Sequence, residues 1–337
     1  MSLFEKLAVL VIPVVVNLSC MSRYASKCEL EPIASGGGTF HACKDDIDDR
    51  LIKEFGLVAE VKGFGQRIMG MAETDNYREY RSGKGNNGIE WLYSLYITPK
   101  DVISAHADYR YLDNDSEVRD NLDKPTYLVS KKDNLRDEYG FYENSKDVYY
   151  RMIADYVHGK EGCDMTPKFI NEPLPRKIEV ILHEDWHVNH AIQAGQPVDH
   201  DVSESVASFV GFYGAAEFAK EKYGEESWIY GQAVRNCYAW ADRASMINAV
   251  YKSLSGIYSR DIPFEHKMDL KRKVFDDAGI PSYNNASIAY DYSYVKYLNE
   301  IFRLYRSKDR DFARTVELLR KVPAAEADAE KFFRDNY

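Results

Sequence analysis

The sequence predicts an α+β protein, with a small sheet in a mixed first half and a mostly helical second half. Three observations lead to this prediction. Aromatic and β-branched residues gather in two short runs before residue 131, as in strands. Apolar residues recur at helical spacing from Leu174 onward, and no internal repeat is visible. We therefore expect a single domain over residues 45–337, mixed over 45–173 and helical over 174–337.

The composition is that of a folded protein with a large core. Of the 337 residues, 45% are hydrophobic and 29% are charged, and only 20 Gly and 11 Pro are present, which excludes a disordered or collagen-like chain. The net charge is −10, from 44 Lys+Arg against 54 Asp+Glu. An acidic surface repels phosphate groups, and the only short basic cluster is 271–273, so we expect no nucleic-acid partner.

The N-terminus resembles an export signal. Residues 7–16 form an apolar stretch, broken by one proline, that is too short to cross a bilayer as a helix. It fits the apolar part of a secretory signal, which we place at residues 1–19. The tetrapeptide that ends in Cys20 resembles a bacterial lipoprotein processing site, although Asn17 stands where Leu is usual. We expect lipid attached to Cys20 to hold the protein to a membrane at the cell envelope, on the periplasmic or extracellular side; the alternative is a buried N-terminal helix or strand.

The remaining cysteines are compatible with an oxidising compartment. Besides Cys20, the chain contains Cys28, Cys43, Cys163 and Cys237, which can form two disulfides whose pairing the sequence does not determine. No C-x-x-C is present, so a cysteine zinc site is not indicated. Residues 20–44 are polar, contain the run Ser35–Gly38 and lack periodicity, which predicts a tether between the lipid and the domain.

The expected elements follow in chain order. Residues 45–72 have helical spacing, and the acidic run at 45–49 suits the beginning of that helix. Residues 89–98 and 127–130 are the strand candidates. A helix over 174–194 is bounded by Pro173 and Pro175 before it and by Gly195 and Pro197 after it. A turn at 199–201 precedes another helix, which we expect to begin at Ser203.

The helix predicted over 174–194 contains the motif H-E-x-x-H. His183 and His187 are four residues apart, so on a helix their imidazoles lie on one face and can bind one ion. Glu184 follows the first histidine, where it can reach a water bound to the metal. The pattern predicts a catalytic zinc site, with one Zn²⁺ per chain.

A catalytic zinc needs a third protein ligand. The metzincin pattern is excluded, because His190 and Gln193 stand where that pattern has Gly and His. We predict Glu204, with His200 and Asp201 as alternatives. The helix of Glu204 carries a stripe of small residues on the same face, which allows a neighbouring helix to approach closely. The residues on this face are Glu204, Ala207, Ser208, Gly211 and Ala215.

The motif followed by Glu in the context Ser203–Ala207 resembles a gluzincin metallopeptidase. Within that clan the chain resembles a family of bacterial predicted aminopeptidases, many of them predicted lipoproteins. The resemblance covers roughly residues 45–320, and besides the motif it rests on Gln66–Arg67, Asn76–Tyr80, Trp91–Val102 and Asn284–Ala286. It implies a zincin-like fold, bound zinc and a peptide substrate.

The chain departs from the family's pattern near the motif. Asp185 and Trp186 stand where the family usually has Leu and Ala, and Ser203 stands where it usually has Asn. Ser208 replaces the Asp that in many gluzincins orients the first histidine. The groups that surround the metal ligands are therefore expected to differ here.

The reaction implied is hydrolysis of a peptide bond. Zinc polarises the substrate carbonyl and lowers the pKa of its bound water toward about 7, while Glu184 accepts the proton and passes it to the leaving amine. Gluzincins commonly supply a Tyr or His from a later helix to the oxyanion, and Tyr294 has the matching spacing from Asn284. Tyr290 and Tyr292 are the alternatives.

Two further points stay open at this stage. An aminopeptidase needs an acidic group for the substrate amine, and Glu172 and Glu179 are among the candidates. The second interpretation of the function, after the peptidase, is that the protein is a non-catalytic zinc-binding envelope lipoprotein. Its closed zinc site would have His200 or Asp201 as a fourth ligand. A third interpretation takes the motif as accidental in a structural helical lipoprotein. We expect His190 to face solvent, with a place beside the metal ligands as the alternative.

Overall fold

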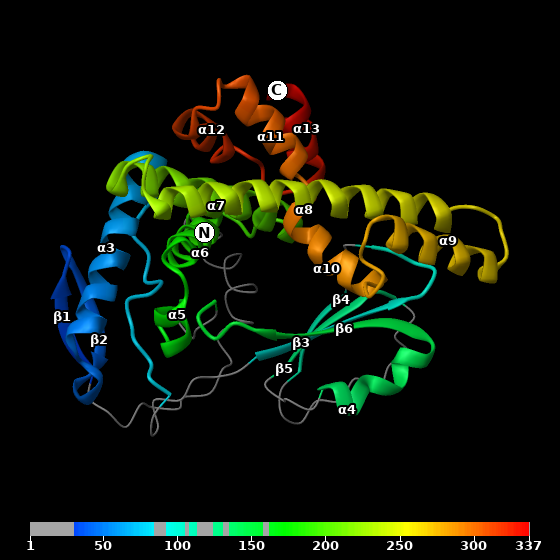
Figure 1. Ribbon diagram of the computed structural model, residues 1–337, viewed down its shortest axis with the longest axis horizontal. Helices are drawn as coiled ribbons and strands as arrows, with labels where there is room; N and C mark the ends of the chain where they lie inside the picture. The colour runs from blue at the N-terminus through cyan, green and yellow to red at the C-terminus, as the bar shows by residue number, and fades with distance from the viewer. Residues whose placement is uncertain are drawn as a thin grey trace, which may run out of the picture.

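The computed structural model describes residues 30–83, 92–104, 108–112, 124–130, 135–157 and 162–336. The predicted signal sequence at 1–19 and the lipidation site at Cys20 lie outside these residues. The architecture is mixed, with small sheets and many helices, as the predicted α+β class requires (Figure 1). Within the described ranges, no helix has both the length and the apolar character that a membrane span needs.

The strands lie in the first half of the chain. They are β1 Leu30–Ser35, β2 Gly38–Cys43, β3 Leu92–Pro99, β4 Asp108–Leu112, β5 Thr126–Ser130 and β6 Lys146–Ile153. The helices are α3 Asp49–Met69, α4 Leu135–Tyr139, α5 Pro167–Asn171, α6 Leu174–Ala194, α7 His200–Tyr223, α8 Trp228–Tyr258, α9 Phe264–Asp277, α10 Asn285–Val295, α11 Leu298–Ser307, α12 Phe312–Leu319 and α13 Glu326–Asn336. Short 3₁₀ turns cover Lys44–Asp46 and Gly140–Asn144.

Part of the predicted tether is folded, so the tether prediction is wrong from Leu30 onward. β1 and β2 form an antiparallel hairpin in which Ser35 pairs with Gly38. Gly36 and Gly37 form the two-residue turn, with φ values of 57° and 86°. Such turns need positive φ at both positions, which glycine adopts freely. The glycine run is therefore a hairpin turn, and Phe40 of β2 is buried against α3.

The two disulfides that four cysteines could form are not both present. Cys43, at the end of β2, is disulfide-bonded. Cys163 and Cys237 are buried free thiols, which leaves no second pair among the four cysteines considered.

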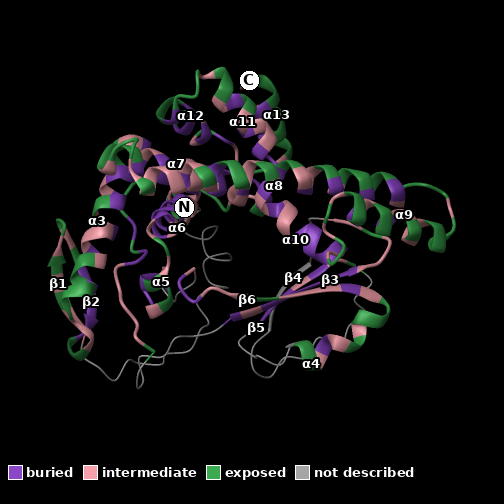
Figure 2. Ribbon diagram, viewed as in Figure 1, coloured by how far each residue is buried: buried purple, intermediate pink, exposed green. Residues whose placement is uncertain are grey.

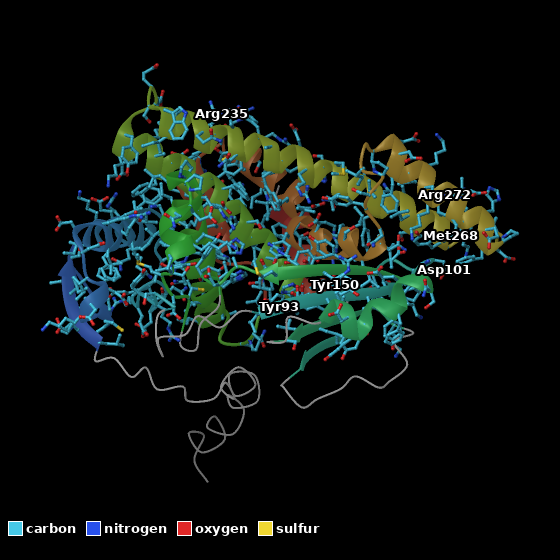
Figure 3. All side chains as sticks on the ribbon, turned by 60° about the horizontal axis from the view of Figure 1, so that its bottom comes forward. Tyr93, Asp101, Tyr150, Arg235, Met268 and Arg272 are labelled. Carbon is cyan, nitrogen blue, oxygen red and sulfur yellow. The ribbon has the colours of Figure 1, made fainter. Side chains whose placement is uncertain are left out.

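The larger sheet has the order β4-β5-β3-β6. β3 is antiparallel to both β5 and β6, whereas β4 runs parallel to β5. The two predicted strands are confirmed as β3 and β5. One face of the sheet packs toward α4 and carries Tyr93 and Tyr150 (Figure 3). The opposite face carries Tyr96, Tyr127 and Tyr149, which pack against α10.

The second half of the chain is helical, as predicted. α6 begins after Pro173 and ends before Gly195, which adopts a left-handed conformation, so its predicted bounds are confirmed. α7 begins earlier than predicted, because Asp199 caps the helix by accepting hydrogen bonds from the amides of Asp201 and Val202. The predicted turn at 199–201 is therefore the first turn of α7. Figure 2 shows that α10 is mostly buried, whereas α8 and α9 expose long faces.

The small residues of α7 bring it close to α6, as the sequence predicted. A Cβ added at Gly211 would lie 2.9 Å from the carbonyl oxygen of Glu179 and 3.2 Å from the Cβ of His183. The first distance is shorter than packed side chains tolerate, and a backbone atom cannot swing away. Gly211 thus sets the separation of the two helices.

We expect Gly211→Ala to force α6 and α7 apart and to lower the free energy of unfolding by about 1–3 kcal/mol. Urea denaturation of the purified protein measures this change. Gly256→Ala is the matched control, because Gly256 also lies in a helix, α8, and has nothing within 4 Å of an added Cβ. Equal stability of the two variants would contradict the close approach.

Candidate metal centre

Three predicted ligands converge between α6 and α7. His183 and His187 lie one turn apart on α6, and Glu204 reaches them from α7. His183 Nε2 lies 3.1 Å from His187 Nε2 and 3.3 Å from Glu204 Oε2, and His187 Nε2 lies 3.6 Å from Glu204 Oε1. In the part of the chain that the structure describes, these three residues form the one group of His, Cys, Asp and Glu able to hold a metal.

The geometry of this group fits zinc. Ligand atoms bonded at about 2.0–2.1 Å to one tetrahedral zinc lie roughly 3.3 Å apart, close to the separations observed. Glu204 Oε2 is buried and has no hydrogen-bond partner among the described residues, although His183 is near. A buried carboxylate oxygen left in this way costs free energy, which a bound cation offsets. Two imidazoles and a carboxylate are also among the donor sets found at zinc sites.

The alternatives to Glu204 lie outside this group. Asp201 is buried and its Oδ2 lies 3.3 Å from the Nζ of Lys296. His200 Nδ1 lies 3.9 Å from Glu204 Oε1, and its side chain is 66% exposed. The described ligand set thus comprises three residues, the number found in catalytic zinc sites that keep one position open.

Ser203 orients the second histidine. Its Oγ lies 2.7 Å from Nδ1 of His187, so that Nε2 of His187 points to the other ligands. Ser208 is buried, and between these described residues no hydrogen bond joins it to His183. Ser203, which differs from the family's usual residue, therefore still provides a hydrogen-bond partner for His187. Ser208 provides none for His183.

The charges of the group stabilise one another. Burial lowers the pKa of His187, but the Glu204 carboxylate outweighs this effect and raises that pKa to about 9. Burial raises the pKa of Glu204, and here His187 and His183 outweigh it, so this pKa falls well below its ordinary value. In the metal-free protein Glu204 is therefore ionised, as a metal ligand must be.

Glu184 lies beside the ligands and contacts Cys163. Burial raises the pKa of Glu184, while the two histidines oppose this shift. The thiol of Cys163 donates to Glu184 Oε2 at 3.6 Å. Burial, and then the charge of Glu184, raise the pKa of Cys163 well above its ordinary value, so the thiol keeps its proton and acts as a donor. The sequence carries no signal for this contact.

The departure at Asp185 has a structural explanation. Asp185 is buried and accepts hydrogen bonds from Lys62 Nζ at 3.0 Å to each oxygen, from Asn76 at 3.1 Å and from Thr74. Asn76 in turn accepts a bond from the amide of Cys163 at 3.0 Å. The network therefore connects Lys62 of α3 to the segment that contacts Glu184. Trp186, the neighbouring departure, is a fully buried core residue.

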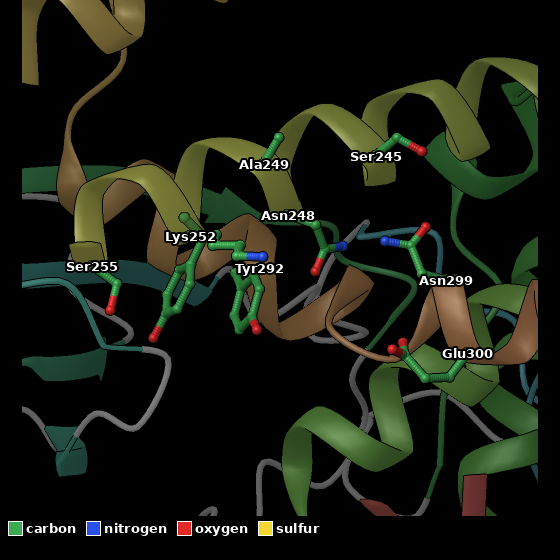
Figure 4. A pocket seen from close by; sticks show the side chains of 9 residues that line it. Ser245, Asn248, Ala249, Lys252, Ser255, Tyr292, Asn299 and Glu300 are labelled. Atoms are coloured by element: carbon green, nitrogen blue, oxygen red, sulfur yellow. The ribbon is translucent and has the colours of Figure 1, made fainter. Parts of the chain in front are cut away.

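The three candidate tyrosines lie on two sides of α10. Tyr290 and Tyr294 share one side, with their hydroxyls 3.1 Å apart. Burial, and then the charge of Glu204, raise the pKa of Tyr294 well above its ordinary value, so its hydroxyl stays protonated. Tyr292 instead stacks on Tyr251, with ring centroids 3.7 Å apart, and lines a cavity of about 570 Å³ with residues of α8 and α11 (Figure 4). The structure thus separates Tyr292 from the other two.

The structure also bears on the positions expected for His190, Glu172 and Glu179. His190 does not face solvent: it is 2% exposed, and its Nε2 donates to the carbonyl of Val322 at 3.2 Å. Glu179 accepts a hydrogen bond from Arg176, and Glu172 accepts one from Tyr156 at 2.9 Å. Both carboxylates are therefore engaged in contacts of their own, and neither is marked as a site for a substrate amine.

No protein-family model, no curated protein and no solved structure matches this chain.

Proposed function

We propose that the protein is a zinc-dependent peptidase of the gluzincin type, with a zincin-like fold, exported and held by lipid at the cell envelope. The observation that carries the proposal is the set of three ligand residues whose nitrogen and carboxylate oxygen atoms lie 3.1–3.6 Å apart, with Glu184 beside them. The resemblance in the sequence adds that the substrate is a peptide and that the enzyme is an aminopeptidase.

Each residue of the site has a role in hydrolysis. His183, His187 and Glu204 hold the metal, which when bound supplies a Lewis acid for the peptide carbonyl and for a water. Glu184 accepts the proton of the attacking water and returns it to the leaving amine. Its raised pKa suits this exchange, because an effective base titrates nearer to neutral pH than an exposed carboxylate does. Tyr294 offers its protonated hydroxyl to the developing oxyanion.

We expect the purified full-length chain to hold about one zinc and His187→Ala to hold almost none. Removing even the partner of a ligand costs about 10–100-fold in affinity, so removing the ligand itself costs more. Elemental analysis after dialysis measures the zinc content. His266→Ala, an exposed histidine of α9, is the control and should keep its zinc. If the unaltered protein holds no zinc in metal-replete buffer, the proposed function is wrong.

The alternative is a non-catalytic zinc-binding envelope protein. It is favoured by His200, whose Nδ1 lies 3.9 Å from Glu204 Oε1, beside the ligand group. A closed site of four protein ligands binds zinc structurally. Loss of zinc in His200→Ala would favour this alternative, whereas retained zinc favours the open site.

A further inference from the structure

The side chain of Arg151 contacts a phenol of α10. Arg151 is on β6, an edge strand, where it pairs with Ser94 of β3. Its Nη1 donates to the hydroxyl of Tyr290, which lies 3.1 Å from the hydroxyl of Tyr294. Its guanidinium also lies over the Tyr290 ring, 5.0 Å from the centroid. The hydroxyl of Tyr290 therefore connects Arg151, through two successive hydrogen bonds, to Tyr294, the residue expected to contact the oxyanion.

The packing of the sheet explains this position. Tyr149 and Arg151 alternate with Tyr150 along β6, so they share the face that packs against α10. β6 and α10 lie side by side in Figure 1. Ser205, the neighbour of Glu204 on α7, donates to the carbonyl of Ser293 on α10 at 3.4 Å. This contact places the tyrosine-lined face near the metal ligands, and the charge of Glu204 accordingly acts on Tyr127, Tyr290 and Tyr294.

Within the part of the chain that the structure describes, no adjacent carboxylate neutralises the charge of Arg151. Among the described residues, no Asp or Glu oxygen lies within 4 Å of its guanidinium. The carboxylate of Asp291, whose charge does act on Arg151, is bonded to Arg243 at 2.5 Å. The side chain of Arg151 is partly open to solvent. A guanidinium near a bound divalent cation is repelled by it, and an anionic ligand between them offsets that repulsion.

We propose that Arg151 binds the terminal α-carboxylate of a short peptide substrate. A guanidinium matches a carboxylate in shape and forms paired hydrogen bonds with it. Two successive hydrogen bonds place Nη1 no more than roughly 6 Å from the Tyr294 hydroxyl, and one extended residue spans about 3.3–3.6 Å. The carboxylate therefore lies one or two residues beyond the bond cleaved. This rests on the proposed function and defines the substrates as di- and tripeptides with a free carboxyl end.

Binding to the zinc-loaded Glu184→Gln chain tests the inference while turnover is strongly slowed. Calorimetry compares trialanine with trialanine amide, and we expect the free acid to bind about 10- to 100-fold more tightly. Arg151→Gln should abolish this preference and keep its zinc, and Arg151→Lys should retain part of it. Arg243→Gln is the matched control, because that arginine is already bonded to Asp291 and Tyr283, and it should keep the preference.

Three results of this comparison would each overturn the inference: equal binding of acid and amide, no binding of either, or an acid preference that persists in Arg151→Gln. Equal binding of trialanine and an amidated peptide with an aspartate side chain would also overturn it, because the terminal carboxylate would then not be the group recognised. Failure of the proposed function has a separate signature, which is that the unaltered zinc-loaded chain hydrolyses no peptide. An acid preference that depends on Arg151 would still stand in that case.

Discussion

Replacing Asp185 with alanine is expected to lower the free energy of unfolding by about 3–5 kcal/mol. The side chains of Lys62 and Asp185 are 7% and 5% exposed, and they are joined at 3.0 Å. Without the carboxylate, the ammonium of Lys62 stays buried with only Thr74 as a hydrogen-bond partner among the described residues. A buried charge without its counter-charge is one of the few single changes that costs this much. Urea denaturation followed by circular dichroism measures the loss.

A double substitution distinguishes two quantities: the stability lost when one charge of the pair is left alone, and the net contribution of the intact pair to stability. Lys62→Met with Asp185→Leu removes both charges and keeps apolar volume, so we expect it to be far more stable than Asp185→Ala, close to the unaltered protein. The coupling energy from the complete cycle should be large, because the two side chains touch. If Asp185→Ala lowers the free energy of unfolding by less than about 1 kcal/mol, the buried pair of Lys62 and Asp185 does not stabilise the fold in the way expected here.

The parts of the fold that the sequence predicted are those set by local signals. α6 has prolines at its start and a left-handed glycine at its end, so its bounds followed from the chain alone. β3 and β5 followed from their aromatic and β-branched residues. Gly36 and Gly37 were misinterpreted because a glycine pair suits both a flexible linker and a tight hairpin turn. The burial of Phe40, which decides between them, depends on α3.

The candidate site likewise combines residues marked by local sequence signals with residues that only the tertiary fold brings together. His183 and His187 follow from the H-E-x-x-H motif on a predicted helix, and Glu204 follows from the small-residue stripe that brings α7 near α6. Cys163 and Arg151 come from distant segments, and only the tertiary fold brings them to Glu184 and Tyr290. No periodicity in one sequence marks such contacts. His190 was misplaced for a related reason, since its partner Val322 is 132 residues away.

We expect Glu184→Gln to reduce peptide hydrolysis by about 10²–10⁴-fold while the zinc content stays near one per chain. Glutamine has the shape of glutamate but cannot accept a proton, so the attacking water loses its base. The amide oxygen can still accept the hydrogen bond that Cys163 donates at 3.6 Å. The fold around the site should therefore persist, and single-turnover assays with zinc analysis on the same sample measure both quantities.

Glu204→Gln is the informative comparison, because it makes the same chemical change at the third ligand. An amide binds zinc less well than a carboxylate, so this variant should lose both zinc and turnover, whereas Glu184→Gln should lose turnover alone. The contrast depends on position, since Glu204 Oε2 lies 3.3 Å from His183 Nε2 and Glu184 Oε2 faces Cys163. Unchanged turnover in Glu184→Gln would exclude this residue as the base. Zinc loss in both variants would instead place Glu184 among the ligands and leave the site without a separate base.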